Sequence, residues 1–134
     1  ADLAYPMGVT FHRAFDRCAN PFEALEHIIN SGCERILTSG QQPTAMEGVA
    51  LIADLVKQAD ERIIIMPGSG VRSDNIIDLA KKTGANEFHT SAKAMKKTEM
   101  KFLSSTMKEQ LQSVTVDAEE VKKILGSLSK IHWQ

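Results

Sequence analysis

The strongest constraint on the fold of this chain is a regular alternation of short apolar runs with longer amphipathic stretches. Each apolar run has the length of a buried strand, and each amphipathic stretch places hydrophobic residues at helical spacing. We expect helices to begin after Asn20, at Pro43, after Ser73 and after Asp117. The expected strands are 9–11, 35–38, 63–66 and 86–90. The pattern predicts an α/β protein built from repeated βα units.

Strands that are each followed by a helix are expected to pair in parallel, because a right-handed crossover returns every strand in the same direction. The units also repeat as a pair, since SGCERILTSG at 31–40 is similar to TGANEFHTSA at 83–92. A (β/α)8 barrel has eight units and about 250 residues, so four units in 134 residues favour half a barrel. An open doubly wound sheet is the alternative, and it gives no reason for the repeat.

The last third of the chain is less regular. We treat residues 1–134 as a single domain, with a long loop at 93–116 before the last helix, because hydrophobic periodicity is weak there. Asp117 and Glu120 have the spacing of a capping box at the start of that last helix.

Polar residues stand at the ends of the expected strands, where barrel enzymes place their chemistry. Side chains alternate across a strand, so outward-facing Phe11, Leu37 and Phe88 would turn their neighbours toward the barrel interior. In such a site His12 would act as general acid or base, and Arg13 would bind an anion. The alternative is that these groups only satisfy one another, for example Glu87 with Arg13 or Arg35. The residues expected to face the interior are Thr10, His12, Thr38, Glu87 and His89, and the candidate catalytic residues are His12, Arg13, Asp16 and His89.

The sequence MPGSGV at 66–71 predicts an anion site. A strand that runs into Gly-Ser-Gly and then a helix turns backbone N–H groups toward one point, where they bind anions. In many barrels the loops after the last two strands bind phosphate, and HTSAK at 89–93 offers further donors, including Lys93. A tight turn without a ligand is the alternative. The candidate anion-binding residues are Gly68, Ser69, Gly70, Thr90 and Ser91.

Imidazole and thiol groups are also candidate metal ligands. We consider His12, Cys18 and His89, although no HxxxH or CxxC spacing accompanies them. Cys33 precedes a strand and is expected to be a small buried hydrophobe. Two unpaired thiols predict a reducing, cytoplasmic setting.

Charge and hydropathy argue against two classes of partner. The chain has 16 basic and 17 acidic residues, a balance that argues against binding nucleic acid by phosphate neutralisation. The longest apolar run, IIIM at 63–66, is far shorter than the ~20 residues of a membrane span. We therefore expect neither a nucleic acid nor a membrane as partner.

The strand-end sequences together resemble a known family. TFHRAFD, LTSGQ, MPGSGV and EFHTSA occur in the order and at the spacing typical of the C-terminal half of the CutC family, the copper homeostasis proteins. The similarity runs from about residue 6 to about residue 125. It implies a TIM-like (β/α)8 barrel of which this chain carries strands 5–8 with their helices, without the first four units. The matching motif positions are His12, Arg13, Asp16, Thr38, Ser39, Gly68, Gly70, His89 and Ser91.

The resemblance implies copper homeostasis as the function, with Cu(I) binding in the cytoplasm and self-association into a homo-oligomer. The cysteines linked to copper in the family lie in its N-terminal half. The alternative function is a TIM-barrel enzyme that acts on a small phosphorylated or carboxylated metabolite at the C-terminal strand ends. The partner is then a copper ion or a small anionic molecule. Open strand edges at 9–11 and 86–90 would also invite pairing with another chain, so we expect dimerisation or poor solubility.

Overall fold

The structure, a computed structural model, describes residues 1–97 and 112–131. Its centre is a sheet of three parallel strands that follow one another in chain order. The strands are β1 (Thr10–Phe11), β2 (Arg35–Thr38) and β3 (Ile64–Pro67). In the register of the sheet, Arg35 lies opposite both Thr10 of β1 and Ile64 of β3. The parallel pairing agrees with the alternation of strands and helices in the sequence.

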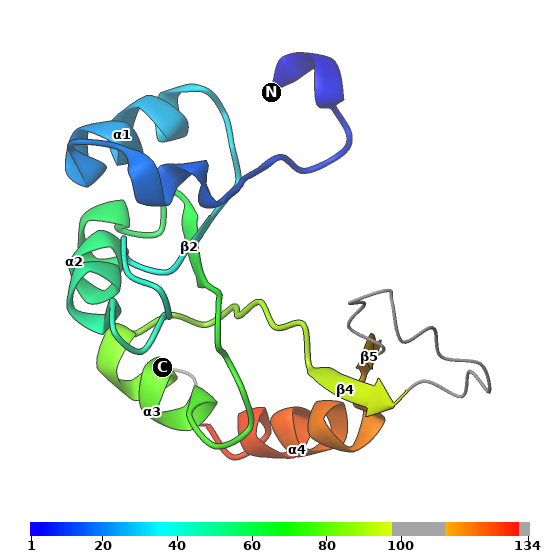
Figure 1. The fold of residues 1–134 in the computed structure, drawn as a ribbon. Coiled ribbons are helices and arrows are strands. Elements are labelled where there is room, and N and C mark those ends of the chain that lie inside the picture. Colours follow the sequence, from blue (N-terminus) through cyan, green and yellow to red (C-terminus); the bar gives the residue numbers. More distant parts are fainter. Residues whose placement is uncertain (98–111, 132–134) are drawn as a thin grey trace, which may run out of the picture.

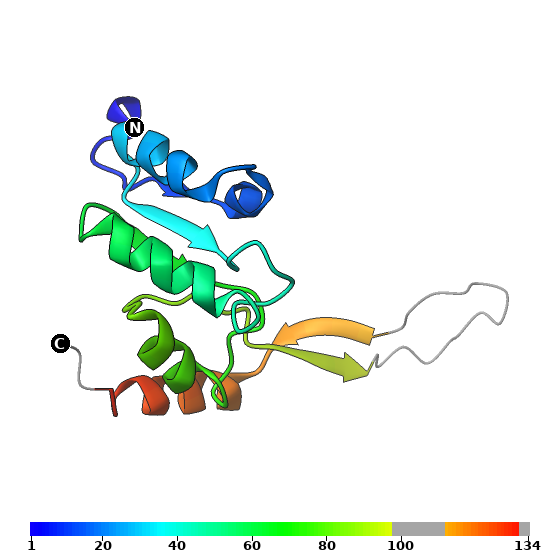
Figure 2. The same cartoon turned by 90° about the vertical axis from the view of Figure 1, so that its left-hand side faces the viewer.

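Three helices cover one face of this sheet. They are α1 (Pro21–Asn30), α2 (Val49–Ala59) and α3 (Ile76–Thr83), and they lie on the same side of the strands (Figures 1 and 2). Residues of β2 and β3 alternate between buried and half-buried, because only one face packs against helices. The fold is therefore α/β, as the sequence predicts. Fully buried core residues are Leu25, Ile36, Ile52, Leu55, Ile76 and Leu79.

The helix starts follow the sequence signals only in part. Asn20 caps α1 as predicted, because its side-chain oxygen accepts the N–H of Glu23 at 3.2 Å. By contrast, α2 begins at Val49 rather than at Pro43. The chain before it forms a turn in which the Thr44 hydroxyl donates to the Glu47 carboxylate at 2.7 Å. A local side-chain pair therefore delays the helix.

The start of α3 depends on α4 (Ala118–Leu128), which is distant in sequence. Ser73 does not cap α3, whose N-cap is Asn75. The Ser73 N–H and hydroxyl instead donate to the Glu120 carboxylate at 2.8 and 3.0 Å. The bond from that N–H is the main cause that lowers the pKa of Glu120 below its usual value. Asp117 caps α4 as predicted, but Glu120 does not complete a capping box, because it binds Ser73.

The expected fourth strand, at 86–90, is not a strand in the structure. The His89 N–H donates to the Pro67 carbonyl of β3 at 2.9 Å, so the segment does run beside the sheet. Pro67 has no N–H to donate in return, and a regular ladder therefore stops at this position.

A β-hairpin replaces part of the long loop expected at 93–116. Its strands are β4 (Lys93–Lys97) and β5 (Gln112–Val116), which pair antiparallel, with Met95 opposite Val114. The hairpin projects from the body of the molecule (Figure 2), and Met95, Val114 and Val116 are exposed. The remainder of the expected loop, 98–111, lies outside the described residues. Weak hydrophobic periodicity did not indicate a loop here. An exposed two-stranded arm buries neither face, so its strands need no alternation of apolar and polar residues.

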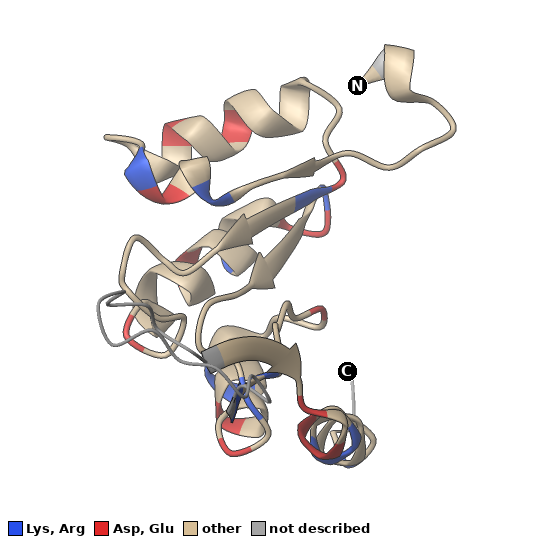
Figure 3. Cartoon of the chain, turned by 45° about the vertical axis from the view of Figure 1, so that its right-hand side comes forward, with Lys and Arg blue, Asp and Glu red and all other residues tan. Residues whose placement is uncertain are grey.

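Acidic and basic residues are interspersed over the helices and strand ends of the described chain (Figure 3). None of the helices within the described ranges combines the length and hydrophobicity that crossing a bilayer requires.

Two glycines let the start of α2 touch the turn after β2. A Cβ atom added to Gly48 would collide with the Ser39 carbonyl oxygen, and one added to Gly40 would collide with the Gly48 backbone. Gly40 also has a φ of 68°, which other residues adopt at a cost. This backbone contact holds α2 against the end of β2.

We predict that Gly48→Ala lowers the free energy of unfolding by roughly 3 kcal/mol, because backbone atoms have to move apart to make room for the methyl group. Gly126→Ala is the matched control, since no atom lies within 4 Å of the added Cβ and Gly126 is inside α4. It should raise stability by up to about 1 kcal/mol. Urea unfolding of the three proteins measures both values, and equal stability of the two variants would contradict the close contact.

Candidate functional site

The carboxylate of Asp16 joins the turn after β1 to the turn after β2. Asp16 belongs to the short 3-10 helix η2 (Arg13–Arg17), and its side chain is only 8% exposed. The Thr38 hydroxyl donates to it, as do the N–H groups of Ser39 at 3.1 Å and Gln41 at 3.2 Å. The Arg13 Nε donates at 2.8 Å. One carboxylate therefore fixes two separate turns relative to each other.

The same hydrogen bonds determine the ionisation of Asp16. Desolvation by burial is the largest influence and raises the pKa, but the bonds from Thr38, Arg13, Ser39 and Gln41 together outweigh it. The pKa lies below the ordinary value of 3.8, so Asp16 is charged at neutral pH. A carboxylate whose oxygens are occupied by this many donors is suited to positioning its neighbours rather than to transferring a proton.

Arg13 is the neighbour that Asp16 positions. Its Nε binds Asp16, and its Nη2 donates to the Ser39 hydroxyl at 2.7 Å. A guanidinium has five N–H donors, so donors remain after these two contacts. Arg13 also lines the cavity described next, and Asp16 therefore holds a cation at the edge of that cavity.

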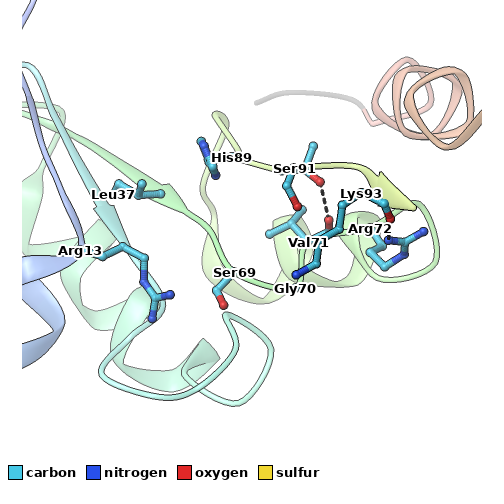
Figure 4. A pocket seen from close by; sticks show the side chains of 10 residues that line it. Arg13, Leu37, Ser69, Gly70, Val71, Arg72, His89, Ser91 and Lys93 are labelled. Atoms are coloured by element: carbon cyan, nitrogen blue, oxygen red, sulfur yellow. Dashed lines mark hydrogen bonds between the residues drawn. The ribbon is translucent and has the colours of Figure 1, made fainter. Parts of the chain in front are cut away.

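A cavity of about 300 Å³ lies at the carboxyl ends of β2 and β3. Figure 4 shows Arg13 and His89 toward one side of it and Lys93 beside Gly70 at the other. Two of the four candidate catalytic residues, Arg13 and His89, thus line one space. So do four of the candidate anion-binding residues, Ser69, Gly70, Thr90 and Ser91, whereas Gly68 does not.

Several backbone donors at this cavity have no partner among the described residues. The N–H groups of Ser69, Gly70, Thr90 and Ser91 make no hydrogen bond to any described residue. The Ser69 and Thr90 hydroxyls are used, because they donate to the carbonyls of Pro43 at 2.8 Å and of Val71 at 2.7 Å. Free N–H groups beside a cavity can bind an anion or water.

The two similar sequence segments form the same turn twice. The Thr38 hydroxyl accepts the N–H of Gly40 at 2.9 Å, and the Thr90 hydroxyl accepts the N–H of Ala92 at 3.0 Å. Gly40 and Ala92 have positive φ angles of 68° and 40°. The repeat in the sequence is therefore a repeat in local structure.

The end of β2 has the opposite orientation from the one predicted. Thr38 is fully buried on the helix side, like Ile36, whereas Leu37 is half-buried and lines the cavity. Burial of Thr38 allows its hydroxyl to bind both Asp16 and the N–H of Gly40. The prediction that Leu37 faces the helices and Thr38 the interior is therefore wrong.

The predicted orientation of the 86–90 segment is confirmed. Glu87 pairs with Arg35 at 2.7 Å, one of the two partners expected for it. Phe88 packs against the hydrophobic core, whereas its neighbour His89 lines the cavity.

His12 lies outside the cavity lining. Its Nδ1 accepts the N–H of Ala14 at 2.9 Å and thereby caps η2. Its ring lies against Phe11, with centroids 5.8 Å apart. The structure brings Arg13 and His89 to one cavity but leaves His12 as a helix cap.

The three residues predicted to bind a metal, His12, Cys18 and His89, do not form a site. In the part of the chain that the structure describes, no three His, Cys, Asp or Glu side chains are placed to hold one metal ion. Cys18 packs against the core, and its carbonyl accepts the Gln41 side-chain amide at 2.7 Å. Cys33 also packs against the core, as expected. Capping and core packing therefore keep the predicted ligands apart.

Comparison with known proteins gives one consistent family. The CutC family model matches residues 1–94. The chain belongs to the CutC family. A family protein CutC from Parabacteroides distasonis is 51% identical over 128 residues, which cover 90% of this chain and 53% of that protein. One from Vibrio cholerae is 53% identical over 102 residues, covering 76% of this chain and 40% of that protein.

A solved structure supports the same relationship. The crystal structure described as a candidate copper homeostasis protein CutC, from Streptococcus agalactiae, superposes with a TM-score of 0.59 at 30% identity. The similar region covers 63% of this chain and 42% of that chain. The chain thus spans about half the length of the CutC proteins that it matches. The CutC-like motifs HRAFD and LTSGQ provide the two sides of the Asp16 network.

Sequence reasoning missed three residues of the cavity, Leu37, Val71 and Arg72. The internal repeat aligns Leu37 with His89, so this signal would have placed Leu37 on the same face as His89. Arg72 follows the glycine turn, and no pattern in the sequence distinguishes it from an ordinary surface arginine.

We predict that Asp16→Asn lowers the free energy of unfolding at pH 7 by about 2–3 kcal/mol, because an amide cannot replace a carboxylate that accepts charged and backbone donors. The folded-state pKa of Asp16 is lowered, so its contribution is present above the unfolded pKa of about 4 and is lost as pH falls through the folded value. The difference between wild type and Asp16→Asn should therefore shrink as the pH is lowered from 7 to 3. Urea unfolding at several pH values measures it, and a difference independent of pH would contradict the ionic role.

Proposed function

We propose that this chain is the part of a TIM-like (β/α)8 barrel that carries strands 5–8 and that it serves cytoplasmic copper homeostasis within a CutC protein. The observation that carries the proposal is the CutC family match over residues 1–94. The description of the Streptococcus agalactiae relative as a candidate copper homeostasis protein supports the cellular role. A parallel sheet with helices on one face is compatible with a section of barrel wall. Because β1 is an edge strand, we also expect a homo-oligomer.

Copper enters this proposal as the metal that is handled rather than as a resident cofactor. The described side chains do not fit a copper site of three donors. The His12 Nδ1 accepts a hydrogen bond that caps η2, and Cys18 packs against the core. No step of a copper mechanism is therefore assigned to these residues.

We expect a strain that lacks the gene to be inhibited at lower copper concentrations than its parent. Wild-type protein and the Cys18→Ser variant should restore growth equally, because Cys18 belongs to no group of metal ligands in the described part of the chain. Growth across a copper series, with protein levels checked by immunoblot, gives the readout. Equal growth with and without the gene would contradict the cellular role, and failure of Cys18→Ser alone would reinstate Cys18 as a ligand.

A second candidate function is binding or conversion of a small phosphorylated or carboxylated metabolite in the cavity at the strand ends. Arg13, Arg72 and Lys93 line this cavity, and no carboxylate from residues 1–97 or 112–131 does. The unpaired N–H groups of the two turns would bind the anion, and Arg13, oriented by Asp16, would add positive charge at the edge of the cavity. His89 would take the acid–base role that the sequence analysis gave to His12, since His89 lines the cavity and His12 does not.

A difference between the two copies of the internal repeat favours anion binding in this cavity. In the first copy the Ser39 N–H donates to the carboxylate of Asp16. In the second copy the equivalent N–H, that of Ser91, has no partner among the described residues, and Ser91 lines the cavity. The same turn therefore binds an anionic group of the chain in one copy and is open to an external one in the other.

We expect at least one small anion among phosphate, sulfate and acetate to raise the unfolding temperature of the intact chain in a saturable way. One-site linkage predicts about 2.7 kcal/mol of stabilisation at a hundredfold excess over Kd. Sodium chloride at equal ionic strength is the control for screening. An increase that chloride reproduces, or one that never saturates, would contradict an anion site.

A further inference from the structure

The cavity has two chemically different ends. At one end, the turn after β3 (68–71) meets the turn that follows the 86–90 segment (90–93), and the residues there present N–H groups and cations. At the other end lie Leu37, the ring of His89 and Arg13, whose guanidinium is paired with Asp16 (Figure 4). A ligand that fits both ends needs an anionic head and a small organic body.

The two turns at the polar end are bonded to each other. The Thr90 hydroxyl donates to the Val71 carbonyl at 2.7 Å, and the Arg72 guanidinium donates to the Lys93 carbonyl at 3.4 Å. Donors on separate turns are therefore held at fixed positions around one space. The free N–H groups of Ser69 and Gly70 come from one turn, and those of Thr90 and Ser91 come from the other.

Lys93 supplies the uncompensated positive charge at this end. Arg13 is paired with Asp16 at 2.8 Å, and Arg72 lies 3.5 Å from the Glu120 carboxylate. The Lys93 ammonium makes no ion pair with any residue of 1–97 or 112–131. Its side chain lies beside the Gly70 turn (Figure 4). Two other cavities differ in charge, since Asp16 lines one, and Asp60 and Glu61 line the other.

Gly68 allows Leu37 and His89 to come together at the second end of the cavity. A Cβ atom at Gly68 would lie 2.5 Å from the Leu37 Cδ1 and 3.3 Å from the His89 Cβ. Without that atom, both side chains approach the same stretch of backbone. The volume of about 300 Å³ lies at the lower limit for ligand pockets, so the organic body has room for only a few carbon atoms.

We propose that this cavity binds a small phosphate monoester, with the phosphate at the two turns and Lys93, and the organic body against Leu37 and His89. The inference rests on the anion-binding function proposed above and specifies its ligand class. A phosphate presents three terminal oxygens in different directions and two negative charges, so it can accept donors from both turns and from Lys93 together. A planar carboxylate has two oxygens and one charge. In many barrels the loops after the last two strands bind phosphate.

Propyl phosphate and butyrate are matched probes, because they carry the same propyl chain on different anionic heads. Each is titrated into the intact ¹⁵N-labelled chain at pH 7.5 and constant ionic strength, with amide and methyl resonances recorded. We expect propyl phosphate to shift the amides of Ser69, Gly70, Thr90 and Ser91 and the methyl groups of Leu37. Its Kd should be at least about tenfold lower than that of butyrate. Inorganic phosphate should shift the same amides without the Leu37 methyl groups.

The Lys93→Gln variant tests the assigned charge. It should raise the Kd for propyl phosphate about three- to tenfold, because one charge-assisted contact is removed. Lys81→Gln is the matched control, since Lys81 is exposed in the last turn of α3 and does not line the cavity. Lys93 is itself exposed, so the variant should retain the dispersed spectrum of the folded chain.

The outcomes separate this inference from the function on which it rests. Butyrate binding as tightly as propyl phosphate would overturn the phosphate assignment and leave an anion site standing. Propyl phosphate that moves the Leu37 methyl groups but none of the four amides would overturn the orientation. Equal loss of affinity in Lys93→Gln and Lys81→Gln would overturn the role of Lys93. The absence of saturable shifts with every probe would refute both proposals.

Discussion

The buried carboxylate of Asp16 is the interaction on which the geometry of the strand ends depends. It accepts hydrogen bonds from the turn after β2 and, through Arg13, from its own 3-10 helix. Burial alone would raise the pKa of this carboxyl, and the hydrogen bonds from its donors outweigh that effect. Because Thr38 turns toward Asp16, its neighbour Leu37 has to turn to the other face, where it lines the cavity. One charge on the helix side of the sheet thus determines which side chains reach the cavity on the other side.

The internal repeat explains why the cavity lies beside the second copy of the turn and not beside the first. Both copies use a threonine hydroxyl to hold a residue with positive φ, at Gly40 and at Ala92. In the first copy the hydroxyl also donates to Asp16, which takes the Ser39 N–H as well. In the second copy the hydroxyl donates to the neutral Val71 carbonyl, and within the described chain the Ser91 N–H stays unpaired. The first turn is closed by a side chain of the protein, and the second is left open.

The sequence was a good guide wherever the decisive contacts were local. The bounds of β2 and the Asn20 cap of α1 follow from residues within one or two turns of each other, and the family followed from four short motifs. Several of the errors involve distant partners. Glu120 lies 47 positions from the Ser73 that it binds, Pro67 interrupts the ladder at His89, and β4 pairs with β5 across residues that show no periodicity. At the site, the positions of Arg13 and His89 could be predicted because both follow the ends of strands. The position of His12 depends on its capping of η2. The position of Leu37 depends on the bond between its neighbour Thr38 and Asp16.

Backbone strain at the strand ends indicates that the cavity is shaped before any ligand arrives. Gln41, Ser69 and Ala92 are not glycines, yet they have positive φ angles of 59°, 80° and 40°, a conformation that costs on the order of 1 kcal/mol each. Each one is held by at least one hydrogen bond to another segment of the chain. Gln41 donates its N–H to Asp16 and its amide to Cys18, the Ser69 hydroxyl donates to Pro43, and the Ala92 carbonyl accepts the N–H of Asp117. Turns held in this way have little conformational freedom left to lose when they bind a ligand, so a few donors suffice for useful affinity. The hydrogen bonds of the fold thus stabilise these unfavourable φ angles. As a result, the turns after β3 and after the 86–90 segment are preorganised at the edge of the cavity.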